Sequence, residues 1–133
     1  MKISRKVLER RLEIEEILKT LDENVDLIIV EGKRDREVLM KLGCKSQIIA
    51  IGEMHKPLFE IVEEIKEKCR GFRVVVLMDF DEEGEKLNKK IEMLLEGYGL
   101  TIEKTLKNKL RKAMFEEDRR RIEELSGILE EEF

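Results

Sequence analysis

The sequence predicts an α/β fold, a three-layer sandwich in which a small, mainly parallel four-stranded sheet is flanked by helices. Short β-branched runs alternate along the chain with longer amphipathic stretches. The strongest run, at residues 72–78, is apolar apart from Arg73 and has V-V-V-L at its centre, which is typical of a strand covered on both faces. Strands that alternate with helices are joined by right-handed crossovers and therefore pair in parallel.

The first half of the chain supplies two strands and three helices. Residues 3–22 carry apolar side chains at helical spacing among charges, which predicts an amphipathic helix. A strand over 25–30, a helix over 34–42 ended by Gly43, and a second strand over 47–51 follow. Pro57 then introduces a third helix, because proline is favoured in the first turn.

The second half contains the strongest strand, a short edge strand and a C-terminal helical extension. A helix runs from the end of the 72–78 strand to G-Y-G at 97–99, and residues 100–102 suit a short edge strand. Residues 103–115 and 118–132 have helical periodicity. We expect one domain over 1–133, with its core in 25–100, an N-terminal helix over 3–22 and a C-terminal helical extension over 103–132.

Composition excludes several classes of protein. Charged residues make up 44% of the chain, yet the net charge is −4, so the bulk basic footprint of a typical nucleic-acid binder is missing. Apolar stretches fall far short of the ~20 residues of a membrane span, and the charged first 20 residues do not resemble a signal peptide. Cys44 and Cys69 form no zinc-knuckle or disulfide pattern. They predict buried apolar side chains and a reducing, cytoplasmic setting.

Two acidic motifs are the most informative feature of the chain. V-E-G-K-R-D at 30–35 and M-D-F-D-E-E-G-E at 78–85 each follow a predicted strand. Ligands bind at the carboxyl ends of strands in parallel sheets, so Glu31, Asp79 and Asp81 are expected to converge there. Side chains two apart in a strand point the same way, which would let the two aspartates share an ion. Carboxylates that crowd together need a hard cation, Mg²⁺ above all.

The residues after Glu31 predict a phosphate site. Gly32 would take a positive φ that lets backbone amides approach a phosphate. Lys33 and Arg34 follow at a helix N-terminus, which favours anions. Crowding by the two aspartates should raise the pKa of Glu31, which suits proton transfer.

Taken together, the two motifs resemble the Toprim domain of topoisomerases, bacterial-type primases and a ribosomal RNA-maturing nuclease. The resemblance covers about residues 25–100. It implies Mg²⁺, one or two ions, held by Asp79 and Asp81, and a role for Glu31 as metal ligand or as general acid and base. Gly32 and Gly84 match the family's glycines. Asp35 and Glu85 match its secondary acidic positions.

The resemblance implies a stand-alone protein that cleaves RNA or DNA with the help of metal, with a partner protein possible. A non-catalytic module that binds metal and nucleic acid within a larger complex is the alternative. A third, less favoured alternative is a phosphotransfer or nucleotide-binding domain of receiver-like build, which needs a late lysine after a further strand that we cannot place. Phosphatases with a nucleophilic Asp-x-Asp carry it after the first strand, whereas here it follows the third.

The remaining polar residues have plainer interpretations. His55 is expected to be an exposed loop residue, and Tyr98 lies on the apolar stripe of its helix. The chain lacks the separate tyrosine domain of a topoisomerase and the template-handling domains of a primase. Basic residues in the C-terminal extension could track a phosphate backbone, but a solvated face is favoured because acids alternate with them. They are Lys104, Lys107, Lys109, Arg111, Lys112 and Arg119–Arg121.

Overall fold

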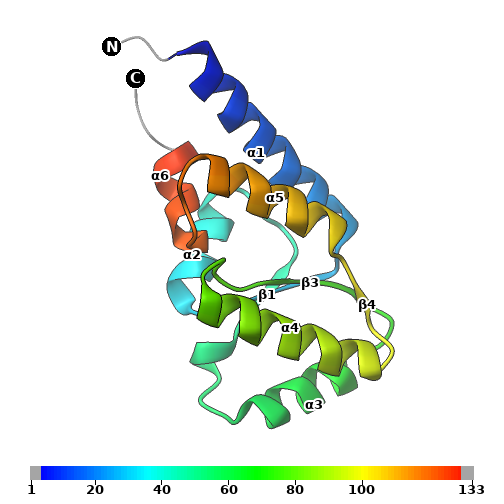
Figure 1. Ribbon diagram of the computed structural model, residues 1–133. Coiled ribbons are helices and arrows are strands. Elements are labelled where there is room, and N and C mark those ends of the chain that lie inside the picture. Colours follow the sequence, from blue (N-terminus) through cyan, green and yellow to red (C-terminus); the bar gives the residue numbers. More distant parts are fainter. Residues whose placement is uncertain (1–3, 130–133) are drawn as a thin grey trace.

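The computed structural model describes residues 4–129, which form one parallel sheet between two layers of helices (Figure 1). All strand pairings are parallel and the strand order is β2-β1-β3-β4. The strands are β1 (Leu27–Val30), β2 (Gln47–Ala50), β3 (Arg73–Leu77) and β4 (Thr101–Ile102). The predicted fold class is therefore confirmed, including the short edge strand.

The central pair of strands fixes where the two acidic motifs end up. Val30 of β1 is in register with Leu77 of β3. All of β1, and all of β3 except Arg73, is buried, as expected for strands covered on both faces. Because the two strands end side by side, the residues that follow them leave the sheet at the same edge.

Each face of the sheet has its own core. On one face, Ile28 and Val75 pack against helices α1, α2, α5 and α6, and on the other, Ile29 and Val76 pack against α3 and α4. Figure 1 shows α1 and α5 together on one side of the sheet and α3 and α4 on the other. The helices are α1 (Arg5–Asn24), α2 (Lys33–Lys41), α3 (Leu58–Lys68), α4 (Glu82–Gly97), α5 (Thr105–Glu116) and α6 (Leu125–Leu129).

The helix predicted over 118–132 is wrong in its first part. Asp118 has φ of 55°, a left-handed conformation that ends the preceding helix, and Arg121 is extended. A 3₁₀ turn, η2 (Ile122–Glu124), then leads into α6. Residues 130–132 of the predicted helix, like Ile3 of the first one, lie outside the described residues. The extended segment that replaces the helix forms a wall of the site described below.

Lys107 also departs from expectation. It was assigned to a solvated face, yet it is 7% exposed and forms an ion pair with the equally buried Glu92 of α4. Because Lys107 lies on the inner side of α5, its amino group is not accessible to a phosphate backbone in solvent. The buried pair instead joins α5 to α4 beside the sheet edge. Within residues 4–129, no helix has the length and apolar character needed to cross a bilayer.

Candidate metal and phosphate site

A pocket of about 510 Å³ opens where β1 and β3 end. It gathers most of the predicted site residues from α2, α4 and the strand ends. Those that line it are Glu31, Gly32, Lys33, Arg34, Asp35, Asp79, Asp81 and Gly84. Residues 48 positions apart in the sequence thus face one space, as the parallel topology led us to expect.

The first motif makes a tight turn from β1 into α2. Gly32 is the N-cap of α2 with φ of −127°, so the predicted positive φ is wrong. An N-cap residue takes extended backbone, and this one needs no left-handed conformation. Its N–H donates to Oδ2 of Asp35 at 3.0 Å, which fixes that carboxylate over the first turn. The carbonyl of Glu31 accepts from the N–H of Gly52 at 2.8 Å, which ties the turn to the residues after β2.

The second motif lies beyond its strand, so the alternation of side chains along a strand does not orient it. β3 ends at Leu77, and Asp79 and Asp81 follow in the turn into α4. Asp81 is the N-cap of α4 and accepts from the N–H of Gly84 at 2.7 Å. Oδ1 of Asp79 accepts from the N–H of Ile122 at 2.9 Å. Each aspartate is therefore held by its own backbone donor.

Gly84 is required by the closeness of α4 to the end of β3. A Cβ atom at this position would lie 2.0 Å from the carbonyl oxygen of Asp79. That oxygen belongs to the backbone and cannot move aside cheaply. The glycine of the second motif therefore allows the first turn of α4 to pack directly on Asp79.

The C-terminal segment is the wall that sequence analysis missed. Glu83, Arg121 and Glu123 also line the pocket. The carbonyl of Arg120 accepts from the N–H of Phe80 at 2.6 Å, and the Phe80 ring meets Phe115 edge-on at 6.2 Å. The buried Phe80 thus anchors the segment. The available signal was E-E-D-R-R-R at 116–121, which has no apolar side chain to place on a buried helix face.

Other predicted residues lie elsewhere. Glu85 does not line the pocket, and its carboxylate accepts from Nε of Arg111 at 3.0 Å. His55 does not line it either. The hydroxyl of Tyr98 donates to Glu63 at 2.6 Å while its ring packs on the α3–α4 core, which is a structural role.

Three acids of the pocket, Glu31, Asp79 and Asp35, have pKa values raised above their ordinary values. Burial, followed by the charges of Asp79, Asp35 and Asp81, raises the pKa of Glu31, as predicted. Burial also raises the pKa of Asp79, and the charge of Asp81 adds to this against the lowering effect of the Ile122 hydrogen bond. The pKa of Asp35 is raised as well, mainly by burial. The pocket is thus short of positive charge.

Comparison with known proteins agrees with this arrangement. The family model of the Toprim domain matches residues 26–122. A UPF0292 protein from Thermococcus sibiricus is 33% identical over 86% of both chains, and one from Pyrococcus abyssi is 39% identical over 86% of this chain and 82% of its own. A solved structure of a protein from Aquifex aeolicus superimposes with a TM-score of 0.64 at 26% identity, covering 85% of this chain and 95% of that one.

The chain belongs to the Toprim domain family, and the relatives it resembles are small UPF0292 proteins. Toprim domains generally bind Mg²⁺ and act on nucleic acids. Membership was predicted from the two motifs and is confirmed.

The residues present fit a magnesium ion in their chemistry. The pocket offers carboxylate oxygens, the donors that Mg²⁺ prefers, and its acids outnumber its bases by six to three. As they stand, no three acidic, histidine or cysteine side chains within 4–129 are close enough together to hold an ion. Glu31, Asp79 and Asp81 are the side chains that would hold it, and they would have to approach one another to do so.

Proposed function

We propose that this protein cleaves phosphodiester bonds of RNA or DNA in a reaction that depends on Mg²⁺. One observation carries the proposal: Glu31, Asp79 and Asp81, from the ends of two strands, line one pocket together with Lys33 and Arg34. Acids for a hard cation and bases for a phosphate thus lie within reach of one scissile group. Membership of a family that acts on nucleic acids supports the choice of substrate.

Each group has a role in this proposal. A bound Mg²⁺ would neutralise the acids and stabilise the negative charge that develops on the phosphate. Glu31, whose pKa is raised by burial and by its acidic neighbours, takes or returns a proton. Asp79 and Asp81 are kept in place by the N–H groups of Ile122 and Gly84, so their remaining oxygens stay directed to the pocket. Lys33 and Arg34 hold the substrate phosphate.

The test compares the parent chain with Glu31→Gln and Asp79→Asn on structured RNA and DNA in Mg²⁺ or Mn²⁺. Asparagine at 79 keeps the oxygen that accepts from Ile122, so loss of charge is the main change. We expect each variant to lose about 10²–10⁴-fold in cleavage rate. Glu67→Gln removes a carboxylate that pairs with Arg70 on α3, outside the pocket, and is the matched control. Full activity of Glu31→Gln would remove Glu31 from the reaction.

A binding module without turnover is the second candidate. Within 4–129 the three carboxylates do not lie close enough together to hold an ion, and a site that keeps this arrangement could still bind nucleic acid through Lys33 and Arg34 without organising the reaction. The same experiment decides between them. Retention of RNA or DNA by both the parent and Asp79→Asn, with cleavage by neither, would establish the module.

A further inference from the structure

A carboxylate lies between two guanidinium groups at the rim of the pocket. Glu123 Oε2 is 3.3 Å from Nε of Arg34, and its Oε1 is 4.0 Å from a terminal nitrogen of Arg121. All three residues line the pocket. Arg34 belongs to the first turn of α2, whereas Arg121 and Glu123 come from the C-terminal segment, 87 and 89 positions later. The fold thus brings two arginines from distant parts of the chain to one anion.

The geometry points to a phosphate site in which Glu123 takes the place of the ligand. We propose that Arg34 and Arg121 together bind a phosphate group of the substrate, and that the carboxylate of Glu123 occupies this site until the phosphate displaces it. The inference rests on the proposed function for the class of ligand, a nucleic-acid phosphate. Arg121 thereby becomes a second binding residue that neither acidic motif contains.

The chemistry of the three side chains favours exchange. Guanidinium groups donate paired hydrogen bonds to the two non-bridging oxygens of a phosphodiester as they do to a carboxylate, and both anions carry a single negative charge. The side chains of Arg34 and Arg121 are 80% and 63% exposed. Ion pairs this exposed are weak, so opening them costs little. The carboxylate of Glu123 therefore competes with a phosphate for the two arginines but does not block the site.

The site formed by Arg34 and Arg121 lies beside the acid cluster of the pocket. Burial dominates the raised pKa values of Asp79 and Asp35, and the negative charge of Glu123 contributes to both, so Glu123 stands beside the acid cluster. A phosphate that replaces it lies next to the same acids. The two arginines thus sit on the side of the pocket where a bound phosphate contacts them and lies beside the acid cluster, whose negative charge a cation would have to offset.

Nuclear magnetic resonance of the arginine side chains tests this without relying on cleavage. Inorganic phosphate is titrated in Mg²⁺ while the Nε–H signals of Arg34, Arg121 and Arg70 are followed. We expect the first two to shift with one common dissociation constant and Arg70 to stay unchanged. In Glu123→Gln the constant should fall about two- to fivefold, the loss of one exposed competing ion pair. Glu67→Gln, which frees Arg70 just after α3, makes the same change in net charge and should leave the dissociation constant unaltered.

Several results would overturn the proposal. They are the absence of any shift at Arg34 and Arg121, independent constants for the two signals, and an equal gain in Glu67→Gln. A second titration uses single-stranded RNA and DNA oligonucleotides in Ca²⁺, with Arg34→Gln and Arg121→Gln each expected to weaken binding and to reduce its salt dependence by about one phosphate contact. If inorganic phosphate binds as expected and neither oligonucleotide does, the two-arginine site stands and the proposed function fails.

Discussion

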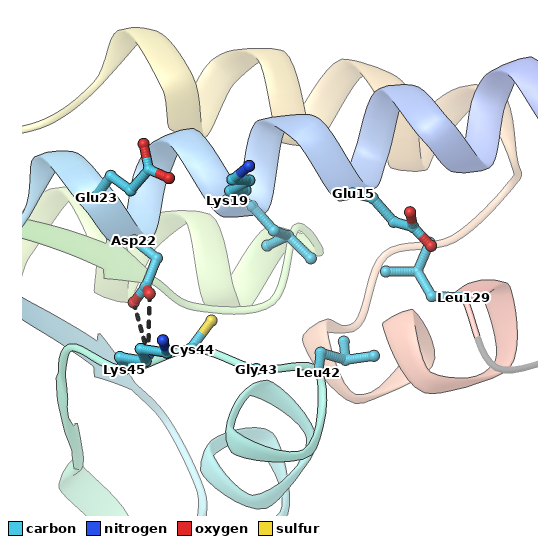
Figure 2. Close-up of a pocket in the computed structure, with 10 residues that line it drawn as sticks. Glu15, Lys19, Asp22, Glu23, Leu42, Gly43, Cys44, Lys45 and Leu129 are labelled. Atoms are coloured by element: carbon cyan, nitrogen blue, oxygen red, sulfur yellow. Dashed lines mark hydrogen bonds between the residues drawn. The ribbon is translucent and has the colours of Figure 1, made fainter.

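The parallel sheet has a carboxyl edge, where its strands end, and an amino edge, where they begin. Each edge holds a half-buried aspartate, and the pKa values of the two aspartates are shifted in opposite directions. At the carboxyl edge, Asp79 has one backbone donor and acidic neighbours, and its pKa is raised, chiefly by burial. At the amino edge, Asp22 lies in a second pocket of about 470 Å³ between α1, α2 and α6 (Figure 2). Its two oxygens accept from the N–H groups of Lys45 and Ser46 at 2.9–3.1 Å. Burial raises the pKa of Asp22 too, but these hydrogen bonds outweigh it and the pKa is lowered.

The contrast separates an acid that stabilises the fold from acids that await a ligand. Asp22 has its partners inside the chain, and the turn before β2 is ordered around it: the Ser46 hydroxyl also donates to the carbonyls of Asp22 and Val25. Asp79 and Glu31 face like charges in a shared pocket, which is a cost in the absence of a cation. A pocket in which several acids face one another therefore indicates binding, whereas a pocket whose acid has its pKa lowered by backbone donors is consistent with structure alone.

The largest effect is expected where the carboxyl edge depends on close packing. Gly84→Ala would place a Cβ atom 2.0 Å from the carbonyl oxygen of Asp79, so α4 must move away from β3. We expect a loss of about 3 kcal/mol or more in the free energy of unfolding. Gly97→Ala, in the last turn of the same helix, meets nothing within 4 Å and is the control, with a gain of at most about 1 kcal/mol. Equal stability of the two variants in denaturant unfolding would refute the packing argument.

At the amino edge the expected effect is smaller. Asp22→Ala removes the acceptor of the Lys45 and Ser46 N–H groups and leaves both donors without it. We expect a loss of about 2 kcal/mol in the free energy of unfolding. Glu23→Ala changes the neighbouring exposed residue of α1 and should be close to neutral, since alanine suits a helix. An equal loss in both variants would mean that the negative charge of α1, and not the hydrogen bonds of Asp22, matters.

The comparison also shows what a sequence can reveal. Local patterns predicted the strands, their parallel pairing and the placement of Glu31 and Asp79 at one pocket, because an apolar run and the residue after it are read directly from the chain. The hydrogen bonds that orient the acids did not. Asp79 is held by the N–H group of Ile122, 43 positions later, and no periodicity in the sequence predicts a backbone donor at that separation. The phosphate contact that we propose for Arg121 is hidden for the same reason.

Errors in the sequence analysis have a common physical origin. The predicted positive φ of Gly32 and the predicted strand geometry of Asp79 and Asp81 both assumed that the motif residues act through their own local conformation. In the structure, Gly32 and Asp81 are helix N-caps, and their place is set by the first turns of α2 and α4. α2 begins three residues after the end of β1, and α4 begins five residues after the end of β3, so capping decides how each motif lies.

The smallest expected effect distinguishes the two edges most sharply, because its sign should reverse between them. A lowered pKa means that Asp22 stabilises the fold above its ordinary value of 3.8, and that this contribution is lost as the pH falls through the folded pKa. A raised pKa means that the contribution of Asp79 is fully present below 3.8 and is lost as the pH rises through its folded pKa. At neutral pH the charge of Asp22 is favourable and that of Asp79 is not.

Replacing each aspartate by asparagine should therefore move the melting temperature in opposite directions. In metal-free buffer at pH 7 we expect Asp79→Asn to melt about 2–4 °C above the parent and Asp22→Asn to melt below it, with both differences shrinking toward acid pH. Added Mg²⁺ should then raise the melting temperature of the parent more than that of Asp79→Asn, because a ligand stabilises the state that binds it. Two results would show that the acids of the carboxyl edge already have their partners within the fold. One is an equal effect of Mg²⁺ on the melting temperatures of the parent and Asp79→Asn, and the other is a metal-free Asp79→Asn that melts below the parent at neutral pH.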